Sequence, residues 1–163
     1  MKKMHPGGVA AAFMLALAAA PAFAHITLSQ QSAPAASDYD ASFRVGHACA
    51  GAGATTGVTA RLPEGFTLIA VEPRDGWTLT VTPKQVQWLA GGPAAAISGS
   101  VKTTFNLRGR LPATPGTLYF KVRQDCDVGS ADWAELPTRD GDKPDFPAAK
   151  LEVLPAGGGE SRQ

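Results

Sequence analysis

The sequence lacks the charge imbalance and the aromatic content that mark several large functional classes. Its 163 residues carry 15 Lys and Arg against 14 Asp and Glu, and only 7% of them are aromatic. A chain without a basic excess has no electrostatic reason to bind nucleic acid or an anionic membrane, so neither is an expected partner. No segment after residue 24 is long and apolar enough to act as a membrane anchor.

Recognisable catalytic patterns are also missing. There is no Ser/His/Asp arrangement in a known context, no phosphate-binding glycine loop ahead of a helix, and no pair of carboxylates at an identifiable spacing. The glycine-rich stretches "AGAGATTG" and "AGGPAAAISGS" are predicted to be turns between strands. The chain is therefore predicted not to be an enzyme.

A sustained apolar period of about 3.6 residues is absent after residue 24, which argues against long helices. Short alternating segments separated by Gly, Pro, Asp and Ser take its place, as in "TLTVTP", where Leu79 and Val81 fall on one face. This pattern predicts an all-β chain folded as a single antiparallel β-sandwich. The predicted strands are His25–Gln30, Tyr39–His47, Gly57–Leu62, Thr67–Glu72, Trp77–Thr82, Gln85–Leu89, Ser100–Arg110, Thr117–Gln124, Ala131–Leu136 and Ala149–Leu154.

The first 24 residues have the features of a bacterial secretory signal. Lys2 and Lys3 precede an apolar run from residue 9 to residue 20, and Ala22-Phe23-Ala24 fits the cleavage pattern. Cleavage after Ala24 would make His25 the first residue of a periplasmic or secreted protein. We expect residues 25–155 to form the folded domain and residues 156–163 a disordered tail.

Cysteine is scarce, with only Cys49 and Cys126 in the chain. Both fall in the exported part, where oxidising conditions favour disulfides, and a bond between them would contribute about 4 kcal/mol on the chain-entropy estimate. The alternative is a thiolate metal site, but there is no CxxC spacing and only two thiols are present. The disulfide is the favoured interpretation.

Histidine is scarce too, and its placement points to metal chemistry. Of three histidines, His5 is lost with the signal, which leaves His25 and His47. A histidine at the first position offers its α-amine and its ring nitrogen to one metal ion, and nitrogen donors in a tetragonal arrangement suit Cu(II). Because binding must displace protons, the affinity is expected to fall in acid. The alternative is that the first residue is His by chance.

The second histidine is expected near the first. If the first two predicted strands form a hairpin, position 25 lies opposite position 44, and His47 falls about 10 Å further along the strand. The candidate metal ligands are therefore His25 and His47, although His47 can equally be a structural histidine at the end of a strand. Trp133 is either a core residue or a wall of the site. Asp125, Asp127 and Asp132 are further candidates, or simply a solvated loop.

The sequence resembles the YcnI-like family of exported bacterial copper-binding proteins, whose domain is immunoglobulin-like. The resemblance spans nearly the whole mature chain, and its order and spacing are more specific than any one segment. The matching segments are "AHITL", "FRVGHACAGAGATTGVTARLPEGF" from residue 43, "GWTL" from residue 76, "FNLRGRLP" from residue 105, "LYFKVRQDC" from residue 118 and "DWAELP" from residue 132.

The resemblance implies a copper site in which the mature histidine, His25, chelates Cu(II) through its amine and its ring. It also implies a tryptophan beside the metal, which matches Trp133, and a Cys49–Cys126 disulfide. In the family a carboxylate completes the site, but the matching strand "TTGVTAR" contains no Asp or Glu. Either His47 or a carboxylate from a loop takes that role, or the metal is held more weakly.

These observations predict a periplasmic copper-binding protein that acts as a chaperone or buffer in copper homeostasis, with other periplasmic copper-handling proteins as candidate partners. One alternative is a copper-dependent oxidase of the polysaccharide monooxygenase type, which requires a second histidine on the metal. His47 is the candidate for that ligand, although few aromatic residues fall in the loops. Another alternative is a metal-free interaction module.

Overall fold

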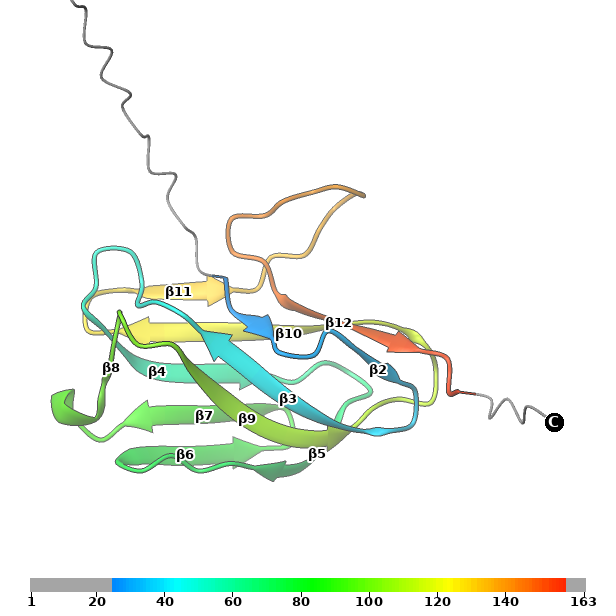
Figure 1. Ribbon diagram of the computed structural model, residues 1–163, viewed down its shortest axis with the longest axis horizontal. Helices are drawn as coiled ribbons and strands as arrows, with labels where there is room; N and C mark the ends of the chain where they lie inside the picture. The colour runs from blue at the N-terminus through cyan, green and yellow to red at the C-terminus, as the bar shows by residue number, and fades with distance from the viewer. Residues whose placement is uncertain (1–24, 158–163) are drawn as a thin grey trace, which may run out of the picture.

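The computed structural model of the chain describes residues 25–157, and these form two β-sheets that pack face to face (Figure 1). The predicted signal segment, residues 1–24, and residues 158–163 of the predicted tail lie outside the described residues. Pro155, Ala156 and Gly157 follow the last strand without regular structure. Between residues 25 and 157 there is no helix with the length and apolar character needed to cross a membrane.

The first sheet has four antiparallel strands in the order β1-β3-β9-β5. They are β1 (Thr27–Leu28), β3 (Asp38–Val45), β9 (Thr103–Arg110) and β5 (Thr67–Val71). The alternating pattern predicted for β9 is confirmed, because Phe105, Leu107 and Gly109 are buried while the residues between them are not.

The second sheet has eight strands, and its main path runs in the order β2-β12-β10-β4-β7-β6. In addition, β11 pairs with β10 and β8 pairs with β4. All pairs are antiparallel except β2 with β12. The strands are β2 (Ser32–Pro34), β4 (Ala54–Arg61), β6 (Trp77–Thr82), β7 (Gln85–Ala90), β8 (Ile97–Ser98), β10 (Gly116–Cys126), β11 (Ser130–Trp133) and β12 (Ala149–Leu154), and a short 3-10 helix covers Pro93–Ala95.

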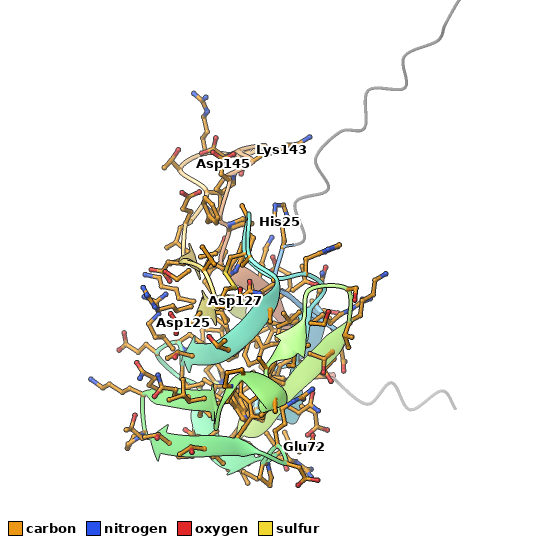
Figure 2. The ribbon with its side chains drawn as sticks, turned by 90° about the vertical axis from the view of Figure 1, so that its left-hand side faces the viewer. His25, Glu72, Asp125, Asp127, Lys143 and Asp145 are labelled. Atoms are coloured by element: carbon orange, nitrogen blue, oxygen red, sulfur yellow. A yellow bond between two sulfur atoms is a disulfide. The ribbon has the colours of Figure 1, made fainter. Side chains whose placement is uncertain are left out.

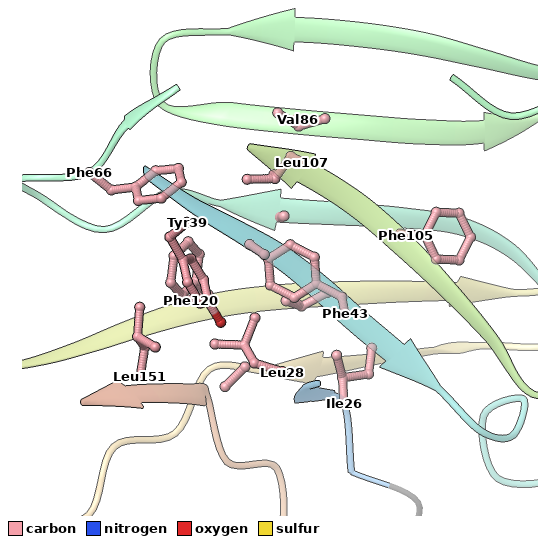
Figure 3. Packing of buried hydrophobic residues seen from close by; sticks show 14 of the residues in the cluster. Ile26, Leu28, Tyr39, Phe43, Phe66, Val86, Phe105, Leu107, Phe120 and Leu151 are labelled. Carbon is pink, nitrogen blue, oxygen red and sulfur yellow. The ribbon is translucent and has the colours of Figure 1, made fainter. Parts of the chain in front are cut away.

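The inward faces of the two sheets form one hydrophobic core, of which Figure 3 shows a part. Phe43 of β3 packs edge-to-face against Phe120 of β10 across the sandwich, with ring centroids 5.6 Å apart. Phe66 packs against the same Phe120 at 5.2 Å. Burying a large apolar side chain contributes roughly 1.5–3 kcal/mol, so this layer supplies much of the stability.

The predicted β-sandwich is confirmed, and each predicted strand overlaps an observed one. The predicted pairing of the first two long strands is also confirmed, but its register differs by two residues. Thr27 pairs with Arg44, so position 25 lies opposite position 46 instead of 44. The reason is that the connecting segment is not a plain turn: it contains β2, which joins the opposite sheet.

The predicted disulfide is present between Cys49 and Cys126, whose Cα atoms are 6.0 Å apart. Cys49 follows β3 of the first sheet and Cys126 ends β10 of the second. The bond therefore connects the two sheets at one end of the sandwich, the end at which His25 and His47 also lie.

Candidate metal centre

Two buried residues just after His25 hold it at one end of the sandwich. Ile26 and Leu28 are each only 2% exposed and anchor the start of the chain in the core. Because side chains alternate along a strand, His25 and Thr27 face outward, and the His25 side chain is exposed. Figure 2 shows His25 at the same end of the molecule as the loop that carries Lys143 and Asp145.

The His25 ring rests against Trp133, the last residue of β11. The two ring centroids are 5.8 Å apart and the planes meet at 67°, an edge-to-face arrangement. Trp133 is 5% exposed, so it belongs to the core and also borders His25. Phe146 packs on Trp133 from the following loop, with centroids 5.2 Å apart. This aromatic support restricts the position of the His25 imidazole.

A buried glutamine links Trp133 to the second histidine. Gln124 is 1% exposed, and its Oε1 accepts a hydrogen bond of 3.2 Å from the Trp133 indole nitrogen. Its Nε2 donates to the backbone carbonyl of His47 at 2.7 Å and to Oγ1 of Thr55 at 2.8 Å. One amide thus connects β11, β4 and the segment after β3.

The sequence gives no explicit prediction for Gln124, although a signal for it exists. Phe120 and Val122 face the core, and Gln124 continues their alternation along β10. A glutamine in an inward position needs hydrogen-bond partners, because an unpaired buried amide is costly. Its position therefore indicates a polar network inside the sandwich.

His47 lies in a bend two residues beyond β3, with an exposed side chain. It lines the same open pocket as His25, a cavity of about 710 Å³. The structure therefore brings the two histidines of the described chain to one pocket. The other residues of the lining are Thr27, Arg44, Val45, Gly46, Lys102, Thr103 and Thr104.

The three candidate aspartates take part in other contacts. Asp127 accepts hydrogen bonds from the backbone nitrogens of residues 53, 54 and 128. Asp125 pairs with Arg123 at 2.9 Å, and Asp132 pairs with Arg61. None of them lines the pocket, and within residues 25–157 no group of three or more His, Cys, Asp or Glu side chains is arranged to hold a metal. A cluster of histidines with these aspartates is therefore not formed.

The loop after Trp133 does not supply a carboxylate to the pocket either. Glu135 accepts a hydrogen bond from the backbone of Phe146 at 3.0 Å and closes the base of the loop. Asp142 accepts bonds from the side chain and the backbone of Thr138, and these hold the pKa of Asp142 below its ordinary value. Both carboxylates stabilise the loop itself.

The donor set of the pocket suits one kind of metal binding. An exposed imidazole at position 25 provides a chelate for Cu(II) when the α-amine of the same residue is free, since both donors are nitrogen. His47 in the same pocket offers a third nitrogen. Among residues 25–157, no Asp or Glu lies in the lining, so at least one position on a bound ion would be open to solvent or to another molecule.

Comparisons with known proteins place the chain by fold and by family model. The family model described as "Domain of unknown function (DUF1775)" matches residues 25–153. An uncharacterized protein from Nocardia farcinica, described as having an immunoglobulin-like fold, is 25% identical with a TM-score of 0.69; the match covers 79% of this chain and 97% of that one. No curated protein matches this chain significantly.

A second solved structure agrees on the fold alone. The seventh ScaB type I cohesin from Pseudobacteroides cellulosolvens is 10% identical with a TM-score of 0.53, over 85% of this chain and 97% of the cohesin. The fold of this chain is therefore an immunoglobulin-like sandwich, as described for the Nocardia protein.

Proposed function

We propose that this chain, which belongs to the DUF1775 or YcnI-like family, is an exported protein. We propose that it binds Cu(II) through the amine and the ring of His25. We further propose that it serves as a chaperone or buffer for copper in the periplasm. Binding, and not catalysis, is the proposed activity.

The observation that carries this proposal is the setting of His25. Its imidazole is exposed, is supported by Trp133, and shares a pocket with His47. The family model also begins its match at residue 25, the residue that signal cleavage would expose. A free amine at this position would complete a two-nitrogen chelate that an internal histidine does not have.

The test is a calorimetric titration of Cu(II) into three proteins: the chain that starts at His25, the same chain with one alanine ahead of it, and His25→Ala. We expect both changes to weaken binding about tenfold or more, which corresponds to about 1.4 kcal/mol or more. Equal affinity of the alanine-extended and native chains would contradict the chelate. Mass spectrometry of the exported protein checks that His25 is its first residue.

The position of His47 favours one alternative, a copper-dependent oxidase with two histidines on the metal. It lines the same pocket as His25, and the oxidase chemistry needs a second histidine on the metal. Release of oxidised oligosaccharides from a polysaccharide in the presence of peroxide would support this function. If no common polysaccharide is cleaved while copper still binds, the proposal of a binding protein is retained.

A further inference from the structure

The pocket beside His25 is basic, and its shape follows from the strand register. Across β1, β3 and β9, Thr27 pairs with Arg44 and Arg44 pairs with Thr104. Their neighbours Leu28, Phe43 and Phe105 are buried, so this row lies on the outer face of the first sheet. The lining residues are thus brought together by three adjacent strands.

Beyond the last paired residues of these strands, His25, Gly46 and Lys102 also line the pocket. Gly46 has no side chain to fill the space there. The absence of a side chain at this position contributes to the hollow in the surface.

Among the described residues, no acidic side chain neutralises the positive charges of this pocket. Within residues 25–157, neither Arg44 nor Lys102 takes part in an ion pair. The opposite end of the same sheet differs, because Arg108 and Arg110 pair with Asp38 at 3.2 and 3.1 Å. No Asp or Glu lines the pocket, so its charged groups are cations only.

We propose that this pocket binds a carboxylate, with Arg44 and Lys102 as its cationic partners and the hydroxyls of Thr27 and Thr104 as further donors. A guanidinium binds a carboxylate through two parallel hydrogen bonds. The side chains of Arg44, Lys102, Thr27 and Thr104 therefore supply charged and hydroxyl donors that suit a carboxylate.

The proposal goes beyond the proposed function and does not depend on it, because the cations are present without metal. One consequence does rest on the proposed function: a carboxylate held next to His25 can contribute an oxygen to copper bound there. The ligand would then complete a coordination shell for which the pocket itself supplies no Asp or Glu. A small dicarboxylate and an acidic side chain of a partner protein share the required chemistry.

The first experiment uses the metal-free chain that starts at His25, with malonate as the probe. Binding is followed by the NMR shifts of the amides of Arg44, Gly46 and Thr104. We expect saturable shifts that weaken in high salt, and little response to the neutral analogue malonamide. Equal binding of malonamide would overturn the proposal, because the neutral compound lacks the carboxylates that the cations attract.

The variant Arg44→Gln/Lys102→Gln tests the two cations. We expect it to lose about fivefold or more in malonate affinity, while the matched variant Arg108→Gln, on the same sheet face, keeps the native affinity. Native affinity in the double variant, with its fold verified by circular dichroism, would overturn the assignment of these two residues.

Two further measurements separate the source of the ligand and the role of copper. Weaker binding of malonate than of a short Asp-rich peptide would indicate a protein partner, and the reverse would indicate a small molecule; both support the carboxylate site.

On the copper-loaded protein, malonate should change the electron paramagnetic resonance spectrum in the native chain but not in Arg44→Gln/Lys102→Gln. An equal change in both would contradict the coupling to copper, and failure of copper binding alone would leave the metal-free result standing.

Discussion

Gln124 shows how one side chain can organise a site that it does not enter. Its amide satisfies three groups at once: the Trp133 indole, the Thr55 hydroxyl and the His47 carbonyl. Because Trp133 borders His25, the amide joins the supports of both histidines. Buried networks of this kind stabilise a structure when every member is paired and destabilise it when one member is removed.

We therefore predict that Gln124→Leu is markedly destabilising. The change leaves the partners of the amide without their hydrogen bonds, and two of them, Thr55 and Trp133, are almost fully buried. An unpaired buried group costs about 1–3 kcal/mol, so the free energy of unfolding should fall by about 2–4 kcal/mol in urea denaturation. The Cu(II) affinity should fall as well, because Trp133 and the His47 segment lose their fixed positions.

The matched control for this prediction is Gln87→Leu. Gln87 makes one hydrogen bond, from Nε2 to Oγ1 of Thr59 at 3.2 Å, at the half-buried surface of β7. The change leaves one buried group unpaired, the hydroxyl of Thr59 (6% exposed), so it should cost about 1–2 kcal/mol, less than Gln124→Leu, and leave the Cu(II) affinity unchanged. A comparable loss of stability in the two variants would show that the Gln124 network has no special role.

At the scale of single residues, strand pairing predicts that His25 and His47 lie at the same end of the sandwich, and both line one pocket. Their role as metal ligands stays a prediction. The environment of each aspartate is not predictable in this way. Asp127 binds backbone nitrogens and Asp132 pairs with an arginine of another strand, and such contacts depend on the fold as a whole.

At the scale of elements, β9 contains a position where only glycine fits. Gly109 pairs with Tyr39 on one side and Leu68 on the other. A Cβ added to it would lie 2.1 Å from Cζ of Phe66 and 2.7 Å from the carbonyl oxygen of Thr67. The ring of Phe66 thus occupies the space above the glycine and packs on Phe120 in the core.

We predict that Gly109→Ala lowers the free energy of unfolding by about 1–3 kcal/mol, because Phe66 must leave its packed position to make room for the methyl group. Urea denaturation measures the change. The control Gly92→Ala adds a methyl group at a position where nothing lies within 4 Å, and it should be nearly neutral. Equal stability of Gly109→Ala and the native chain would show that the strand can shift freely.

The strands that the sequence pattern did not predict are two of the short ones, β2 and β8. β2 and β8 have three and two residues, too few for an alternating pattern to be recognised. In β6 the alternation is visible, yet Val81 remains 48% exposed, because β6 is the last strand of its sheet and little covers it. The long strands are predicted well since each has one face in the core.

At the scale of the whole molecule, the Cys49–Cys126 disulfide cross-links the two sheets. It joins the segment after β3 to the end of β10 across a sequence separation of 77 residues. Cys49 also donates its backbone N–H to Sγ of Cys126 at 3.0 Å. The sequence predicts this bond because a chain that is expected to be exported and has two cysteines has one pairing to make, and the fold supplies the distance that the pairing needs.

Closing so long a loop restricts the unfolded chain more than the folded one, so removal of the bond should act mainly on overall stability. We predict that Cys49→Ser/Cys126→Ser lowers the free energy of unfolding by about 4 kcal/mol, measured by urea denaturation. Dithiothreitol should bring the native chain to the stability of the variant and leave the variant unchanged. Because the bond lies two residues from His47, the folded variant should also bind Cu(II) more weakly than the native chain if His47 contributes to the site. A variant as stable as the native chain would mean that the packing of the two sheets alone holds this end of the molecule together.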